Sequence, residues 1–183
     1  MFWCNPTIIG LIKALALRPT YARALAKEHK LSPPYVTRVL NRLRTLKVLV
    51  SKGELNKNIY SVNYESLLAR ELLRLSTLMM MKEEKVLKKL SRICPFGIYG
   101  SYSEGRQDGG SDLDLWIYDI KAKSTGVRSL LNELESSIGV RVNALYIDRE
   151  KLEKLRTQDP EFYFRLRFQS LTDFLEVLGG KIR

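Results

Sequence analysis

The sequence predicts an α+β protein built from two parts that are joined by a long connecting helix. Three observations support this prediction. Residues 1–65 carry 11 basic and 3 acidic side chains, residues 66–94 carry 7 and 3, and residues 95–183 carry 13 and 14. Apolar residues follow helical spacing in the first half, and short apolar strands follow in the second. A loop rich in Gly and Ser precedes two closely spaced aspartates. The charge asymmetry indicates a polyanion-binding segment fused to a chemically different one.

Composition excludes several classes of protein. With 45% hydrophobic and 28% charged residues, the 183-residue chain can bury a core and is not disordered. Its two cysteines, Cys4 and Cys94, are too few for a disulfide framework or a Cys-rich zinc site, which favours a reducing, cytoplasmic location. The apolar start lacks a basic leader, so we expect no signal peptide, and no run of about 18 apolar residues predicts a membrane span.

Residues 1–63 are predicted to form a first domain of three helices and a hairpin. Apolar residues between Ile8 and Leu17 predict the first helix, and a shorter, Ala-rich helix follows at residues 22–26. Ser32-Pro33 is typical of an N-cap followed by proline at the first helical position, so a third helix begins there. The strand-like segments VLVSK and IYSVN then flank a turn at residues 53–58.

This order of helices and hairpin resembles the winged helix-turn-helix DNA-binding domains. The resemblance covers roughly residues 6–63 and implies that the third helix enters the major groove while the hairpin touches the DNA backbone. It implies base-edge contacts from Tyr35, Arg38, Asn41 and Arg42, and phosphate contacts from Lys52 and Lys57. Two alternatives to DNA binding stay open: the basic face of the third helix is simply solvated, or the domain is a protein-interaction module. The coincidence of periodicity, cap, hairpin and charge favours nucleic acid.

Residues 64–93 contain neither proline nor glycine and are predicted to form the connecting helix. Its apolar residues repeat at alternating steps of four and three, with an interruption at Lys82 and Glu83. The repeating residues are Leu68, Leu72, Leu75, Met79, Val86, Leu90 and Ile93. The pattern fits either a homodimer seam or a helix that packs on its own domains, and the interruption favours packing.

Residues 94–183 are predicted to form a second domain, in which the candidate chemistry lies. FGIY and DLDLWIY are two apolar strands separated by the loop GSYSEGRQDGGS, and VRVNALYI is a third strand beyond a helix. Asp112 and Asp114 are two residues apart, so on a strand their side chains project from the same face. Adjacent carboxylates repel unless a cation lies between them, and their oxygens suit Mg²⁺ (or Mn²⁺). Gly100 allows close approach of a phosphate, which Ser101 can hold.

The segment GSYSEGRQDGGSDLDL resembles the signature of minimal nucleotidyltransferases of the DNA polymerase beta superfamily. The shared features are Gly-Ser, a Gly four residues after the Ser, and Ser-Asp-x-Asp-Leu. The resemblance implies a small α/β domain with a mixed sheet that binds a nucleoside triphosphate such as ATP. It implies nucleotide binding by Gly100, Ser101, Gly105 and Ser111, with metal held by the catalytic Asp112 and Asp114.

The third carboxylate that this family usually carries is replaced here by Asn143. An amide oxygen can ligate Mg²⁺ but brings no charge and cannot accept a proton as a base. Asp148 lies five residues further on with opposite strand parity, so it is a poor substitute, whereas Glu104 or Asp108 from the loop can contribute. The presence of Asn143 instead of a carboxylate is expected to impair turnover more than nucleotide binding.

The tail containing DPEFYFRLRF also resembles members of this group that look archaeal. Phe162, Phe164 and Phe168 are interpreted as core residues rather than as a base-stacking platform. Arg165 and Arg167 are either surface residues or contacts to the triphosphate.

The function that the resemblances imply is Mg²⁺-dependent transfer of a nucleotidyl group from a nucleoside triphosphate to an acceptor, tethered to DNA by the winged helix. The alternative is a DNA-binding transcriptional regulator whose degenerate transferase domain binds only nucleotide or a partner protein. A third idea, that of an antitoxin which modifies or masks a partner RNase, rests on the family alone.

Overall fold

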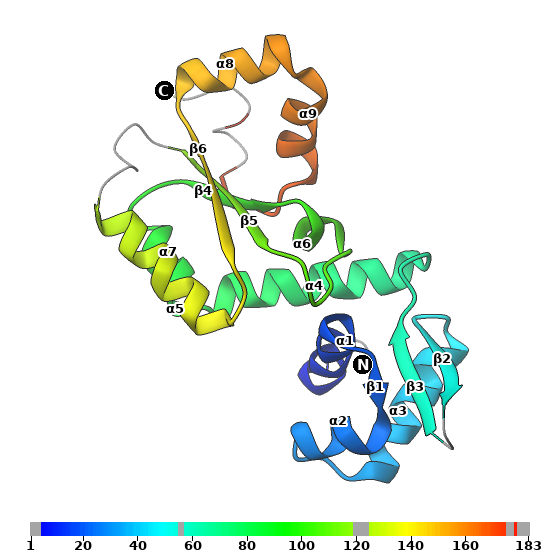
Figure 1. Cartoon of the computed structure of the whole chain (residues 1–183). Coiled ribbons are helices and arrows are strands. Elements are labelled where there is room, and N and C mark those ends of the chain that lie inside the picture. The colour runs from blue at the N-terminus through cyan, green and yellow to red at the C-terminus, as the bar shows by residue number, and fades with distance from the viewer. Residues whose placement is uncertain (1–4, 55–56, 119–124, 175–177, 179–183) are drawn as a thin grey trace. The chain divides into compact units, whose positions relative to one another are not determined.

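The computed structural model describes residues 5–54, 57–118, 125–174 and 178 (Figure 1). The protein has a mixed α+β fold with two three-stranded sheets. It divides into two compact units, the first comprising Met1–Ser76 and Gly105–Gly110 and the second comprising Thr77–Glu104 and Ser111–Arg183. The predicted connecting segment 64–93 therefore contributes to both units, and a short piece of the glycine-rich loop belongs with the first.

The first unit packs its helices on a small antiparallel sheet. Its elements are α1 (Pro6–Leu17), β1 (Thr20–Tyr21), α2 (Ala22–Glu28), α3 (Pro33–Thr45), β2 (Leu49–Glu54) and β3 (Lys57–Val62), with strand order β1-β3-β2. The three predicted helices and the hairpin are present, whereas the two-residue strand β1 was not predicted. The strands extend to Glu54 and resume at Lys57, so the predicted turn at 53–58 is too long; residues 55–56 lie outside the described part.

Local sequence signals explain where helices α1 and α3 begin. The Asn5 side chain accepts a hydrogen bond from the Thr7 amide at 2.9 Å, and Pro6 occupies the first helical position of α1. Ser32 stands at the N-cap of α3 as predicted, but its side chain makes no capping hydrogen bond. The fixed φ of the following prolines therefore supplies the helix-starting signal there.

The predicted connecting helix is broken into α4 (Leu67–Glu83) and α5 (Lys85–Leu90). Glu84 has an extended backbone, and its carboxylate accepts a hydrogen bond from the Val86 amide at 3.2 Å, which caps α5. Leu72 is buried in the core of the first unit, while Val86 and Leu90 are buried in a core of the second. Three of the seven residues of the apolar repeat, Leu72, Val86 and Leu90, are thus buried within the units, as the packing interpretation predicted. Leu68 and Ile93 are instead 38% and 54% exposed, so this interpretation explains only part of the repeat.

The second unit is built on a mixed sheet. Its further elements are β4 (Phe96–Tyr99), α6 (Ser101–Glu104), β5 (Leu113–Tyr118), α7 (Thr125–Ile138), β6 (Val142–Ile147), α8 (Arg149–Gln158) and α9 (Pro160–Gln169). The strand order is β4-β5-β6, where β4 and β5 are antiparallel and β5 and β6 are parallel. The helical turn α6 corrects the prediction of an unbroken loop after Gly100, because Ser103 donates both its amide and its hydroxyl to the Gly100 carbonyl.

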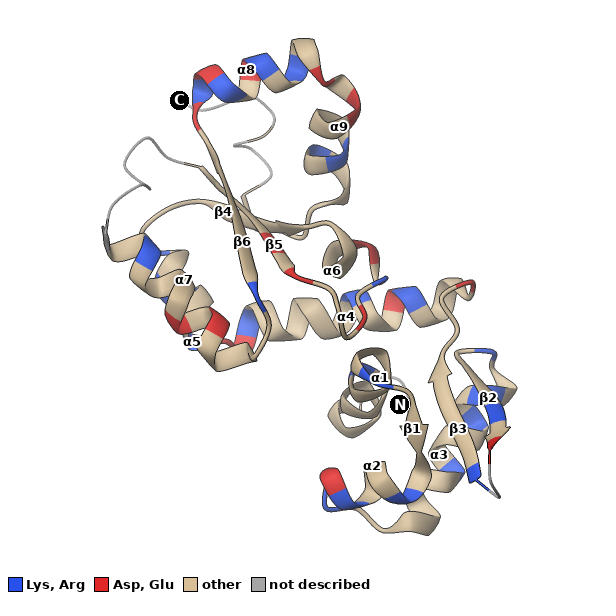
Figure 2. Cartoon of the chain, in the orientation of Figure 1, with Lys and Arg blue, Asp and Glu red and all other residues tan. Residues whose placement is uncertain are grey.

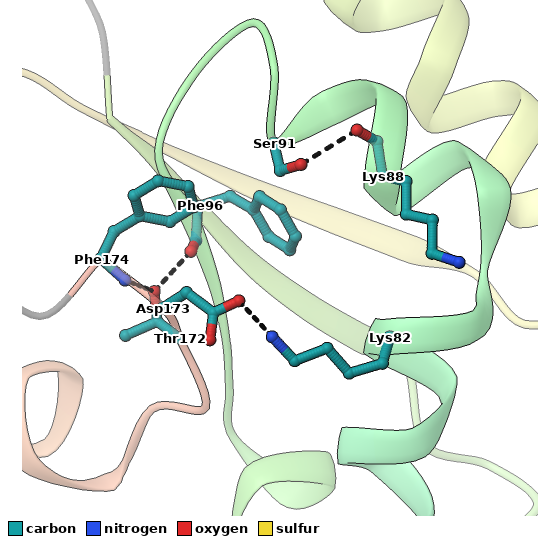
Figure 3. Close-up of polar contacts among 7 residues, drawn as sticks. All are labelled: Lys82, Lys88, Ser91, Phe96, Thr172, Asp173 and Phe174. Atoms are coloured by element: carbon teal, nitrogen blue, oxygen red, sulfur yellow. Dashed lines mark hydrogen bonds and ion pairs between the residues drawn. The ribbon is translucent and has the colours of Figure 1, made fainter.

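A segment after α9 closes the free edge of β4 (Figure 3). Ile98 and Leu171 exchange two backbone hydrogen bonds, of 2.9 and 2.8 Å. The Thr172 hydroxyl donates to the Phe96 carbonyl at 2.6 Å and accepts from the Phe174 amide at 3.0 Å, while Lys82 pairs with Asp173 at 2.5 Å. The strand edge is therefore paired rather than open, which protects β4 from adding a foreign strand.

The aromatic residues of α9 are not all core residues. Phe162 is half-buried against Tyr99, with ring centroids 6.0 Å apart, in line with the prediction. Phe164 and Phe168 are 52% and 70% exposed, so the prediction that they are core residues is wrong. The helix instead buries Tyr163 and Leu166, which lie on its opposite side.

Candidate nucleic-acid surface and carboxylate site

Helix α3 has an apolar face and a polar, basic one. Figure 2 marks the basic residues in this part of the chain. Val36, Val39, Leu40 and Leu43 are each at most 4% exposed and belong to the core of the first unit. Of the predicted DNA-contacting residues, Tyr35 is half-buried, while Arg38, Asn41 and Arg42 are exposed. The amphipathic spacing of the sequence thus places three of these four side chains on the solvent face of one helix.

The hairpin braces α3 through contacts that the sequence analysis missed. The Tyr60 hydroxyl of β3 donates to Asn41 Oδ1 at 3.3 Å, and Arg44 Nη1 donates to Ser51 Oγ of β2 at 3.3 Å. Tyr60 itself is only 3% exposed, so it holds Asn41 from within the core. No local sequence pattern links Asn41 with a residue 19 positions away.

The two predicted phosphate-contacting lysines lie on the hairpin and are exposed. Lys52 is 4.0 Å from Glu54, and both side chains are largely in solvent, so this pair constrains Lys52 little. Lys57 lies over the ring of Tyr21, with its ammonium nitrogen 4.6 Å from the ring centroid. The strand β1 therefore supplies an aromatic support for Lys57 that was not predicted.

In the second unit, the sheet brings together the two predicted aspartates and Asn143. Asp112 precedes β5, Asp114 lies on it, and Asn143 is the parallel-register partner of Asp114 on β6. Asn143 Nδ2 donates to Asp112 Oδ2 at 3.1 Å and to Asp114 Oδ1 at 3.2 Å. A single amide group thus bridges both carboxylates, where the family pattern expects a third carboxylate.

Gly100 suits its position because its backbone is left-handed, and the Asp114 side chain lies beside it. Its φ is +69°, a conformation that favours glycine, and a Cβ at this position would lie 2.5 Å from Asp114 Oδ2. Ser101, which begins α6, and Ser111 are half-buried. Gly100 and the carboxylates are therefore neighbours, as the predicted site requires.

The electrostatics of this site disfavour the charged form of Asp114. Burial, together with the neighbouring Asp112 charge, raises the pKa of Asp114, and the hydrogen bond from Asn143 lowers it in part. Burial and the Asp114 charge also raise the pKa of Tyr99. Arg141 Nε lies 3.9 Å from Asp112, but this arginine is 73% exposed. Its charge is therefore largely screened by solvent.

Gly105 has a packing role in the first unit. Its φ is +68°, and a Cβ there would lie 2.1 Å from the Arg70 carbonyl of α4. Within the same unit Gln107 is 3% exposed, and its carbonyl accepts from Tyr64 at 2.8 Å. Close packing against α4 thus explains why a glycine occupies position 105, without the predicted nucleotide contact.

The other acids considered for the third position have partners of their own. Asp148 accepts from the Lys151 amide at 2.7 Å and caps α8. Glu104 pairs with Arg165 at 3.3 Å, and Asp108 accepts from the Gly110 amide at 3.0 Å. Asn143, and not one of these acids, is therefore the side chain that contacts both Asp112 and Asp114.

The donor set fits a divalent cation only in part. Two carboxylates can hold Mg²⁺ together with waters and phosphate oxygens. Asn143 directs its NH₂ group at both carboxylates, so its oxygen ligates a cation only after the amide turns. No group of three His, Cys, Asp or Glu side chains suited to a metal occurs in the part of the chain that the structure describes.

Comparisons with known proteins identify no family for this chain. No protein-family model and no curated protein matches the sequence. A solved structure of a mutant of Lactococcus lactis ZitR shares 15% identity and gives a TM-score of 0.37, over 74% of this chain and 73% of that chain. At this TM-score the likeness carries no argument about fold or function. Within the described residues, no helix is long and apolar enough to cross a membrane.

Proposed function

We propose that this protein binds double-stranded DNA through α3 and the β2–β3 hairpin and acts as a DNA-binding regulator. The observation that supports this most is the solvent face of α3, where Arg38, Asn41 and Arg42 are exposed above a fully apolar opposite face. Arg suits guanine and Asn suits adenine in the major groove. The hydrogen bond from Tyr60 to Asn41 Oδ1 limits the orientations of this side chain, which reduces the ordering cost of binding and leaves Nδ2 to donate to a base.

The hairpin supplies the sequence-independent part of this proposed interface. Lys52 and Lys57 are exposed at its distal half, where they can neutralise phosphates. Phosphate contacts release counterions, so the logarithm of the affinity is expected to fall with the logarithm of the salt concentration by about 0.9 per contact.

DNA binding is tested by anisotropy titrations of a labelled mixed-sequence duplex at several salt concentrations. Lys57→Ala is expected to weaken binding and to reduce the salt slope by about 0.9. Arg38→Ala is expected to weaken binding to a selected site by about 5- to 150-fold, the equivalent of 1–3 kcal/mol. Arg128→Ala is the matched control, because it removes the same charge from an exposed position on α7. A salt-independent affinity, or equal losses in Arg38→Ala and Arg128→Ala, contradicts the proposal.

A second function is favoured by the convergence of Gly100, Asp112, Asp114 and Asn143. We propose that this site binds a nucleoside triphosphate with Mg²⁺ and supports nucleotidyl transfer. Asp112 and Asp114 would hold the cation, which supplies positive charge against the phosphates. In the reaction, an acceptor hydroxyl oxygen bonds to the α-phosphorus, the bond to the pyrophosphate oxygen breaks, and the hydroxyl proton passes to solvent, because the Asn143 amide cannot take it.

Nucleotide binding and transfer are tested separately. Titration with ATP in Mg²⁺ is expected to show binding that Asp112→Asn and Asp114→Asn abolish. Incubation with α-labelled nucleotides and candidate hydroxyl acceptors then reports transfer. Mg²⁺-dependent binding without transfer leaves the regulator as the function and limits the site to nucleotide sensing, whereas no binding at all removes the second proposal.

A further inference from the structure

Helix α9 carries a pair of stacked, exposed aromatic rings. Phe164 and Phe168 are one helical turn apart, their ring centroids are 5.9 Å apart, and their planes differ by 14°. They are 52% and 70% exposed, the latter being the largest exposed fraction among the large hydrophobic residues of the described chain.

Other side chains of α9 supply most of its packing in the second unit. Helix α9 is anchored by Tyr163 and Leu166, which are 5% and 0% exposed and pack in a core that includes Trp116. The Tyr163 hydroxyl also donates to the Leu178 carbonyl at 2.9 Å. Phe164 contacts the buried Tyr163 edge-on, with ring centroids 5.6 Å apart, yet Phe164 and Phe168 still present much of their apolar surface to water, which is typical of a binding surface.

Charge is unevenly distributed along the same helix. Asp159 and Glu161 lie at its start, where Asp159 caps the helix by accepting from the Phe162 amide at 3.1 Å. Arg165 and Arg167 lie in its second half, beside Phe168. The guanidinium carbon of Arg167 is 5.3 Å from the Phe168 ring centroid, and no carboxylate of the described residues is within ion-pair distance of Arg167. The C-terminal half of α9 thus combines flat rings with a cation.

We propose that Phe164, Phe168 and Arg167 form a stacking platform for the bases of a single-stranded nucleic acid. Bases stack on aromatic rings whatever their sequence, and an adjacent arginine adds cation–π and phosphate contacts. The nearly parallel arrangement of the two rings offers flat faces, which suit a base better than the irregular side chains of a protein partner. This surface lies on the second unit and is independent of duplex binding by α3 and of cation binding by the carboxylates.

The platform is tested on the full chain with a fluorescein-labelled oligo(dT) of about 12 nucleotides, within the usual site sizes for such binding. Replacement of both rings, Phe164→Leu with Phe168→Leu, keeps apolar side chains but removes the stacking faces. It is expected to lower the affinity for the single strand about tenfold or more and to leave duplex affinity unchanged. Replacement of both by tyrosine keeps the rings and is expected to retain binding. Ile93→Ala, at another exposed apolar position of this unit, is the control and is expected to change nothing.

Three outcomes overturn the proposal. One is an unchanged single-strand affinity in the double leucine variant. Another is an equal loss in the leucine and tyrosine variants, which indicates a structural role for Phe164 and Phe168. The third is a change of oligomeric state by light scattering in the leucine variant with unchanged oligo(dT) binding, which assigns the surface to contact between copies of this chain. Arg167→Gln with an unaltered salt dependence removes Arg167 from the platform.

Discussion

The turns at Gly100 and Gly105 have almost the same backbone conformation but different structural roles. Their φ angles are +69° and +68°, and they flank the short helix α6, five residues apart. Beside Gly100 lies the mobile end of a side chain, the carboxylate of Asp114, whereas beside Gly105 lies the backbone of α4. Gly100 belongs to the second unit and Gly105 to the first. Of the two glycines that flank α6, one therefore accommodates a candidate functional group and the other accommodates a helix.

The difference between Gly100 and Gly105 is tested most strongly by the substitution Gly105→Ala. The added Cβ would lie 2.1 Å from the Arg70 carbonyl oxygen, which a helix backbone cannot easily vacate, and the positive φ adds strain. We expect a loss of roughly 3–5 kcal/mol in the free energy of unfolding, the sum of overpacking and left-handed strain. Chemical denaturation measures this loss, with hydrogen exchange of the α1 and α3 amides reporting on the first unit.

Gly139→Ala is the matched control for Gly105→Ala. Its φ is +67°, but no atom lies within 4 Å of the added Cβ, so only the strain of about 1–2 kcal/mol is expected. Equal losses at the two positions contradict the claim that Gly105 is required by contact with α4.

Gly100→Ala is expected to have an intermediate effect on stability. The Cβ meets the end of the Asp114 side chain, which can rotate away, so the loss should be about 2 kcal/mol, mostly from backbone strain. The displaced carboxylate should weaken Mg²⁺-dependent stabilisation, which thermal unfolding in EDTA and in Mg²⁺ compares. If the stabilisation by Mg²⁺ is present in the wild type and unchanged in the variant, Gly100 does not make room for a functional carboxylate.

The sequence predicted the parts of the molecule that depend on local spacing. The apolar positions of α3, from Val36 to Leu43, follow from helical periodicity. Strand alternation was expected to bring Asp112 and Asp114 together, although Asp112 lies one residue before β5 and both aspartates accept from Asn143. The partners of these side chains could not be predicted, because Tyr60 and Asn143 reach them through the tertiary fold. The exposure of Phe164 and Phe168 was missed because five of the ten residues of α9 are Phe, Tyr or Leu, so apolar residues lie on every side of the helix and periodicity alone does not show which side is buried.

Asn143→Asp tests the role of the amide group that contacts Asp112 and Asp114. The change removes the amide that donates to both aspartates and adds a third negative charge. At neutral pH in EDTA we expect a loss of about 1–2 kcal/mol in unfolding free energy. Added Mg²⁺ should recover it and bind more tightly than in the wild type, as calorimetric titration measures. Asn132→Asp, at an exposed position of α7, is the control for charge alone, and an identical response there contradicts the role given to Asn143.

The smallest expected effect is that of Asp114→Asn on stability without metal. Because burial and Asp112 raise the pKa of Asp114 in the folded protein, folding favours the protonated form. The wild-type contribution is then fully present below the unfolded value of 3.8 and is lost as the pH rises through the folded pKa. Replacement by Asn removes this loss, so in EDTA the variant should be more stable than the wild type at pH 7 and not below pH 4. The gain should be about 0.5 kcal/mol or less, because solvent screens a partly exposed carboxylate.

In saturating Mg²⁺ the order of the two stabilities should reverse, since the variant lacks a ligand for the cation. Thermal unfolding between pH 3 and 7 measures both effects. If the variant is less stable than the wild type in EDTA at pH 7, the charged Asp114 side chain stabilises the fold, and the expected gain from its removal is wrong.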